Sequence, residues 1–207
     1  MKARLTVFGC GGHATVVYDA AGSQGAYDVV AFVDDTAAET TFHGLPVHMS
    51  IRDVEAEFFV VGFGALDDLT RRGAAFREAE EAGLRAASVI HPSATVSGSA
   101  NIGDGCFIAS QAHVGPEAAL GENCIVNTSA IVEHGCQLGD GVFVGSNAAL
   151  TGESKVGAYA LIGAGAVVLP GIQIGRDAVI GAGAVVTKDV PQGAVMVGNP
   201  ARVMKKG

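Results

Sequence analysis

The chain has 207 residues, of which 49% are hydrophobic and 16% charged, which is enough apolar material for one or two folded domains and excludes a disordered chain. Its 30 glycines, 6% aromatic residues and lack of tryptophan predict a thin, regular core of small aliphatic side chains. The formal net charge of −8 opposes the phosphate backbone, so we expect no nucleic-acid partner.

No stretch of the sequence reaches the roughly 18 to 20 consecutive apolar residues that span a bilayer. The first residues, MKARLTVFGCGG, run from a strand pattern into a glycine loop and contain no apolar segment followed by a cleavage site. We therefore expect a cytoplasmic protein without a membrane partner.

Residues 1–88 have the pattern of a small α/β domain with a Rossmann-like half fold. The helix starts and stops are marked by glycines at the expected ends. The predicted elements are, in chain order, a strand over 5–8, a glycine loop over 9–12, a helix over 13–21, strands over 29–33 and 58–61, and a helix over 67–82 closed by Gly83.

The glycine loop satisfies the spacing G-x-G-x-x-A, and two carboxylates, Asp34 and Asp35, follow the next strand roughly twenty residues later. This pattern indicates a phosphorylated ligand at a helix N-terminus, although a purely structural tight turn is an alternative. Fewer than ninety residues make only half of a dinucleotide fold. A single nucleotide that carries a sugar therefore fits better than NAD, and NAD-dependent redox chemistry has no support beyond the fingerprint.

We expect this nucleotide to lie between the loop and the acidic pair. The loop would contact its diphosphate or ribose, and the carboxylates its hydroxyls or ring nitrogens. The residues assigned to this substrate site are Gly11, Gly12, His13, Asp34 and Asp35.

Residues 89–207 contain a repeat of period six. Seventeen consecutive positions at this spacing, from Ile90 to Val186, are all Ile, Val or Leu, for which chance odds are on the order of ten to the minus ten. Four residues after each, fourteen of sixteen positions are Ala, Cys or Ser. The period fits a parallel β-helix with three short strands in each coil of about 18 residues, and the tail after Pro191 is predicted to form a cap.

Two details follow from the phase of the repeat. Cys106, Cys124 and Cys136 occupy the small inward position, so we expect buried, inert thiols and neither a disulfide nor a metal site. The residue after the aliphatic one is often glycine, which we attribute to turns that need unusual dihedral angles.

The segments FGCGGHA, FVDD, VIHPSATV, NTSAIVEHGCQLGD and VGNPA together resemble the bacterial sugar acyltransferases that include the bacillosamine-pathway and perosamine N-acetyltransferases and the sialic acid O-acetyltransferases. The resemblance covers essentially the whole chain. It implies a left-handed β-helix, a homotrimer, and acetyl-CoA bound as co-substrate in the groove between neighbouring prisms, with no metal.

His134 is the candidate catalytic base. It lies two residues after the inward Val132, in a turn outside the core, where an imidazole can accept the proton that an attacking amine or hydroxyl loses. From the residues alone it is equally an ordinary exposed histidine. The resemblance implies the general base, without a covalent acyl-enzyme. It also implies a substrate-positioning role for Asn127.

Gly152 lies eighteen residues after His134 and therefore one coil above it, and the resemblance implies that its N–H stabilises the oxyanion. The resemblance also assigns the pantetheine arm of the cofactor to backbone groups at Ala164 and Ala182. Phe143 stands where relatives often carry a second histidine near the thioester.

The chain departs from the family's pattern directly after the base. Gly135 replaces the usual acidic residue, so Glu133 or a carboxylate of a neighbouring chain would have to orient the imidazole. The first functional hypothesis is N-acetylation of a nucleotide-linked 4-amino-6-deoxy sugar by acetyl-CoA. The alternatives are O-acetylation of a sialic acid type of sugar and a β-helix binding or scaffold protein that has lost catalysis.

Overall fold

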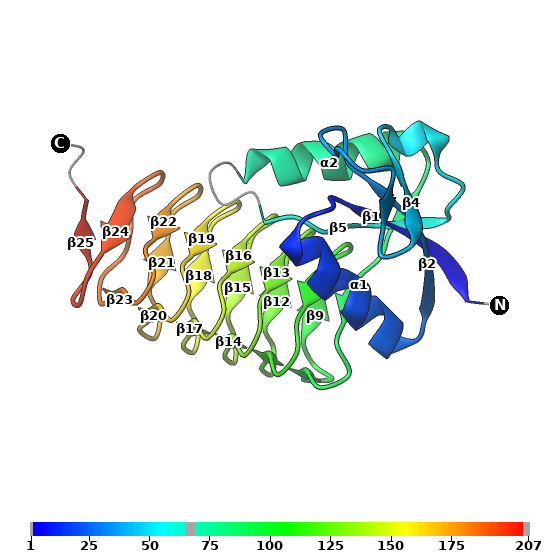
Figure 1. Cartoon of the computed structure of the whole chain (residues 1–207). Coiled ribbons are helices and arrows are strands. Elements are labelled where there is room, and N and C mark those ends of the chain that lie inside the picture. The colour runs from blue at the N-terminus through cyan, green and yellow to red at the C-terminus, as the bar shows by residue number, and fades with distance from the viewer. Residues whose placement is uncertain (1, 65–68, 205–207) are drawn as a thin grey trace.

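The computed structural model describes residues 2–64 and 69–204 and contains an α/β domain at one end of a three-sided parallel β-helix (Figure 1). The α/β domain has a six-stranded sheet in the order β3-β4-β2-β1-β5-β6. Its elements are β1 (Ala3–Phe8), α1 (Gly12–Gln24), β2 (Tyr27–Val33), β3 (Thr41–Phe42), β4 (Leu45–His48), the short 3₁₀ helix η1 (Ile51–Asp53), β5 (Phe58–Val61), α2 (Thr70–Glu81) and β6 (Arg85–Ala86).

The predicted strands and helices of this domain are confirmed, with shifted ends. β1 pairs in parallel with β2 and β5, so the glycine loop and the end of β2 share one edge of the sheet. α1 runs three residues beyond the predicted end and stops at Gly25, which has φ +74°. The first two residues of the predicted helix over 67–82 lie outside the described residues. The β3–β4 hairpin was not predicted; its turn uses left-handed residues at His43 and Gly44.

The β-helix has three parallel sheets, which form its three faces. We name them by what lies outside each. The covered face consists of β7 (Val89–Ile90), β10 (Phe107–Ile108), β13 (Ile125–Val126), β16 (Phe143–Val144), β19 (Leu161–Ile162) and β22 (Val179–Ile180), and is extended by the cap strands β24 (Val195–Val197) and β25 (Arg202–Val203). The aliphatic face consists of β8 (Thr95–Val96), β11 (His113–Val114), β14 (Ile131–Val132), β17 (Ala149–Leu150), β20 (Val167–Val168) and β23 (Val185–Val186).

The polar face completes the triangle and presents mostly amide and charged side chains to solvent. Every strand pairs with the strand 18 residues further on, as Ile131 does with Ala149, which confirms the predicted coil. The cap differs, because β25 pairs antiparallel with β24. The strands of the polar face are β9 (Asn101–Ile102), β12 (Ala119–Leu120), β15 (Gln137–Leu138), β18 (Lys155–Val156) and β21 (Gln173–Ile174).

The interior of the β-helix is the predicted column of aliphatic and small residues. The three cysteines Cys106, Cys124 and Cys136 are each 0% exposed and carry free thiols, as expected. Stacking identical side-chain types at one height in every coil buries a continuous apolar core, although no single coil could bury its own inner face.

The explanation predicted for the glycines is wrong. The nine glycines that follow aliphatic residues have no positive φ. Instead, a Cβ at eight of them would lie within 3 Å of the backbone of the next coil; at Gly139 it would be 2.7 Å from the nitrogen of Ala158. Left-handed dihedrals occur two residues later, as at Gly135 and Asn123. Close stacking of the coils therefore selects these glycines, and turn geometry does not.

The α/β domain covers one face of the β-helix. α1 packs Ala14, Val17 and Ala21 into a shared apolar cluster with Phe107 and Ile125 on the covered face. α2 lies at the edge between the polar and covered faces (Figure 1). No helix among the described residues is long and apolar enough to cross a membrane.

Candidate active site and nucleotide pocket

His134 lies in a turn at the edge between the aliphatic and polar faces, and its side chain is exposed. The register of β14 and β17 places Gly152 directly above it in the next coil, as the 18-residue spacing predicts. The imidazole lies against this glycine: a Cβ built on Gly152 would be 2.5 Å from Nε2 and 2.6 Å from Cε1 of His134. A base and a backbone N–H are thus adjacent.

The N–H of Gly152 is free to bind a ligand. Its neighbours Thr151 and Glu153 donate their N–H groups to carbonyl oxygens of adjacent coils, but the N–H of Gly152 has no acceptor in the part of the chain that the structure describes. An unpaired donor beside an imidazole can stabilise negative charge on an oxygen that forms there.

The other residues predicted to act with His134 lie on a different edge. Asn127, Ala164 and Ala182 occupy turns between the covered and aliphatic faces, at the opposite margin of the aliphatic face. The Asn127 side chain accepts a hydrogen bond from the N–H of Thr128 at 2.8 Å. The N–H groups of Ala164 and Ala182 have no acceptor among the described residues. One chain therefore divides the predicted site between two edges.

Phe143 begins β16 and points outward on the covered face. It is 7% exposed and packs in the apolar cluster beneath the α/β domain, with Ile125 and Leu161. Within one chain it contacts this cluster, away from the edge that carries His134.

The predicted nucleotide site coincides with a pocket of about 500 Å³ at the carboxyl ends of β1 and β2. Gly11, Asp34 and Asp35 line it, so the structure brings the glycine loop and the acidic pair together. A cavity of this size can hold a nucleotide. The remaining lining residues are Phe8, Gly9, Cys10, Val33, Thr36, Met49, Phe63, Arg71, Ala74, Ala75 and Glu78.

The carboxylate of Asp34 holds the loop in place. It accepts hydrogen bonds from the N–H of Cys10 at 3.0 Å and from the N–H and hydroxyl of Thr36 at 2.9 and 2.7 Å. Burial raises the pKa of Asp34, but these hydrogen bonds and the charge of Arg71 outweigh it and lower the pKa. Asp35 is exposed, so its carboxylate is the one open to a ligand.

His13 points away from the pocket, into the junction between the two domains. Its ring meets that of Phe107 edge-on, with centroids 5.4 Å apart, and its Nε2 is buried without a partner among the described residues. Burial, and then the charge of Arg72, lower the pKa of His13 to about 4. The imidazole is therefore neutral at physiological pH. The described residues contain no group of three or more side chains arranged to hold a metal ion.

Comparisons with known proteins agree with both halves of the chain. The family described as the PglD N-terminal domain matches residues 4–72, and the bacterial transferase hexapeptide family (six repeats) matches 117–152 and 153–188. A variant of perosamine N-acetyltransferase from Caulobacter crescentus, solved with CoA and GDP-perosamine, is 33% identical, with 98% of this chain and 97% of that chain covered and a TM-score of 0.91. The chain belongs to the bacterial sugar acyltransferases with a β-helix.

Two further structures extend the comparison. The acetyltransferase domain of PglB from Neisseria gonorrhoeae FA1090, in complex with acetyl coenzyme A, is 32% identical over 99% of this chain and 100% of that chain, with a TM-score of 0.92. WeeI from Acinetobacter baumannii AYE is 26% identical over 97% and 99%, with a TM-score of 0.87. A comparison with curated protein sequences finds no match.

In this sugar acyltransferase, the predicted orienting residue Glu133 is occupied elsewhere. Its Oε2 accepts the backbone N–H of His134 at 3.3 Å, and the imidazole has no hydrogen-bond partner among the described residues. Glu153 was not predicted. Its Cγ lies 3.3 Å from the Cβ position of Gly135, and its N–H donates to the carbonyl of His134 at 2.9 Å. The 18-residue offset from Gly135 was the signal that could have identified it.

Sequence reasoning also missed the helical wall of the nucleotide pocket. Arg71, Ala74, Ala75 and Glu78 of α2 line it at spacings of three and four, which place them on one helix face. Arg71 is the one cationic side chain among the described lining residues. Helical spacing could have shown that these residues share a face, but the sequence did not show that the face meets the glycine loop.

Proposed function

We propose that this enzyme transfers the acetyl group of acetyl-CoA to the amine of a nucleotide-linked amino sugar, of the 4-amino-6-deoxy class. The observation that carries the proposal is the imidazole of His134 lying against Gly152, whose N–H is unpaired, in a chain similar over its full length to an enzyme solved with CoA and GDP-perosamine. The nucleotide-sized pocket beside Asp35 supplies the second half of the substrate site.

In the proposed reaction the sugar amine attacks the thioester carbonyl carbon directly. His134 accepts the proton that the amine loses, and the N–H of Gly152 donates a hydrogen bond to the oxyanion of the tetrahedral intermediate. The carbon–sulfur bond then breaks, and the CoA thiolate leaves and takes the proton from the imidazolium. The products are the sugar acetamide and free CoA.

We propose in addition that the enzyme is a homotrimer whose aliphatic faces meet at the threefold axis. The three faces differ in what covers them. The covered face lies beneath the chain's own α/β domain, and the polar face is solvated. The aliphatic face presents Ile131, which is 38% exposed, above Ala149, Val167 and Val185. An uncovered strip of aliphatic side chains favours self-association.

This arrangement would complete the active site. With the aliphatic faces inward, the edge that carries His134 and Gly152 in one protomer meets the edge that carries Asn127, Ala164 and Ala182 in the next. Light scattering should give three times the chain mass. Ile131→Asp should dissociate the trimer and abolish turnover, whereas the matched change Gln137→Asp on the polar face should leave both intact. A fully active monomer would refute the arrangement.

The function is tested by thiol release from acetyl-CoA in the presence of UDP-, GDP- and dTDP-linked 4-amino-6-deoxy sugars, with free sialic acid as comparator. Turnover with one nucleotide amino sugar supports the proposal. Turnover with sialic acid alone would establish O-acetylation instead. Nucleotide-sugar binding without turnover would show a binding protein whose catalysis is lost, with Gly135 and Phe143 as the first positions to revert.

A further inference from the structure

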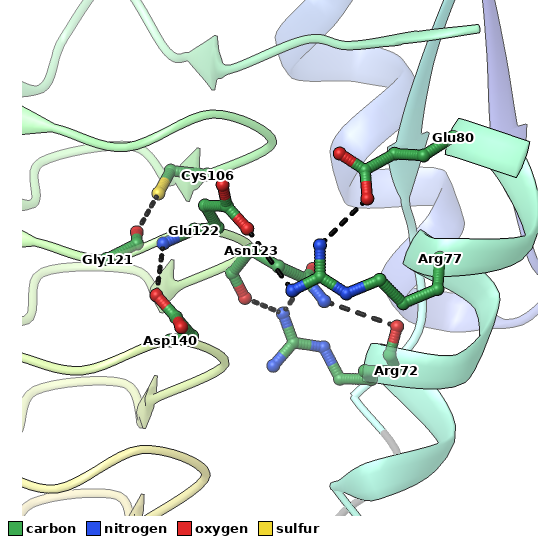
Figure 2. A network of polar contacts seen from close by, with 8 residues as sticks. All are labelled: Arg72, Arg77, Glu80, Cys106, Gly121, Glu122, Asn123 and Asp140. Carbon is green, nitrogen blue, oxygen red and sulfur yellow. Dashed lines mark hydrogen bonds and ion pairs between the residues drawn. The ribbon is translucent and has the colours of Figure 1, made fainter. Parts of the chain in front are cut away.

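Arg72 of α2 is buried between the two domains (Figure 2). It is 0% exposed, and its Nη2 donates to the carbonyl oxygen of Asn123 and, at 3.0 Å, to the side-chain Oδ1 of the same residue. Its Nη1 donates to the carbonyl oxygen of Gly141 at 3.2 Å. Asn123 completes the contact through Nδ2, which donates to the carbonyl oxygen of Arg72 at 3.2 Å.

This guanidinium has no counter-ion. None of the ion pairs of the described residues includes Arg72, and its Nε has no partner there. Burial lowers its pKa to about 10, so it remains charged at neutral pH. Burying an unpaired charge is unfavourable, and an apolar side chain of similar size often stabilises a fold better. Stability alone therefore does not account for an arginine here.

The geometry of the contact supplies a different reason. Asn123 and Gly141 are 18 residues apart, so the planar fork of Arg72 bridges two successive coils at one edge of the β-helix. Both acceptors have left-handed backbone, with φ of 54° and 67°, which turns their carbonyls toward α2. The apolar contact of α1 with the covered face is non-directional. Arg72 is what sets the position of α2 along the rod.

The residues on either side of this contact belong to the two halves of the proposed site. Arg71, the residue before Arg72, lines the nucleotide pocket. Asn123 leads through β13 directly to Asn127 at the opposite edge of the covered face. Resting on the function proposed above, we infer that Arg72 is a positioning residue that fixes the span between bound nucleotide and the acetyl-transfer site.

The chemistry explains why this span matters. A sugar linked to a bound nucleotide meets the thioester at a high effective concentration only when the two sites are held at the matching distance. A displacement of about 1 Å far from the reacting atoms can reduce turnover by about a hundredfold. Nucleotide binding alone does not need the matching distance, and neither does CoA binding.

The test compares Arg72→Met and Arg72→Lys with the matched control Arg77→Met. Arg77 lies on the same helix and also reaches the β-helix, through Glu122 at 3.4 Å, but it is exposed (Figure 2). In the Arg72 variants we expect kcat for the nucleotide amino sugar to fall at least about tenfold, with the Kd values of the nucleoside diphosphate and of CoA within about twofold of wild type. Arg77→Met should match wild type in all three measurements.

A second variant keeps the test decisive where the Arg72 variants unfold. Asn123→Gly retains the left-handed backbone and removes only the side-chain contacts, so it should show the same loss of kcat with intact binding. Unchanged kcat in any folded variant would overturn the inference. So would a loss of nucleotide or CoA affinity in proportion to kcat, because it would show simple structural damage. An inactive wild-type enzyme would instead refute the proposed function.

Discussion

Replacing Gly152 by alanine tests the candidate active site most directly. φ at Gly152 is not positive, so alanine introduces no backbone strain. Its Cβ would lie 2.5 Å from Nε2 of His134, whereas ordinary contact begins at 3.4 Å, so the ring must retreat by about 0.9 Å. The N–H of residue 152 remains in place.

A base displaced by this distance should lower kcat by about a hundredfold. The free energy of unfolding should change by less than about 0.5 kcal/mol, because the imidazole is the exposed end of a flexible side chain. Thiol release from acetyl-CoA with the amino-sugar acceptor measures the first quantity, and urea unfolding the second. The control is Gly98→Ala, where a Cβ meets open space.

The double variant with His134→Ala separates the causes. If Gly152→Ala acts by displacing the imidazole, the double variant should be no slower than His134→Ala alone. Additive losses would mean that the glycine contributes separately from the histidine. If kcat of Gly152→Ala stays within about threefold of wild type, the contact between ring and glycine is not the catalytic arrangement.

Three further results are expected. His134→Ala should lower turnover by roughly a hundredfold or more while the Kd of acetyl-CoA, measured by calorimetry, stays unchanged; an unaltered rate would remove the residue from the mechanism. Arg71→Gln should weaken nucleoside diphosphate binding by about tenfold in the same calorimeter, as expected for one charge-assisted hydrogen bond, and Arg71→Lys should recover part of it. The pKa of His13 falls to about 4 on folding from an ordinary value of 6.5, so only the unfolded chain takes up a proton between these values, and stability declines as pH falls. Urea unfolding at pH 7 and 5 should show a loss of about 2 kcal/mol that is smaller in His13→Gln; equal losses would contradict it.

The repeat could be predicted because one physical constraint recurs in every coil. Each inward position must be aliphatic or small, so the period of six is visible without any knowledge of the fold. The same regularity located Gly152 above His134. The reason for the glycines after the aliphatic residues could not be read in this way, since the limiting contact is with backbone a whole coil further on, as Gly139 shows.

The nucleotide pocket could be predicted only in part. Gly11 and Asp35 follow strands that are neighbours in the sheet, so the motif already places them together. Whether Asp34 binds the ligand or the loop depends on the hydroxyl of Thr36, a contact with no sequence signature. Arg71 enters the pocket because α2 is docked by Arg72, and such packing between domains is not encoded in local patterns.

The close stacking of coils also limits how this rod can change in length. Inserting or deleting one residue between positions 90 and 186 would turn inward side chains outward and place a Cβ where a glycine now touches the next coil. Removing or adding 18 residues preserves every register. Length can therefore vary only by whole coils, and coils added beyond Gly152 would carry the cap further from the α/β domain without moving His134.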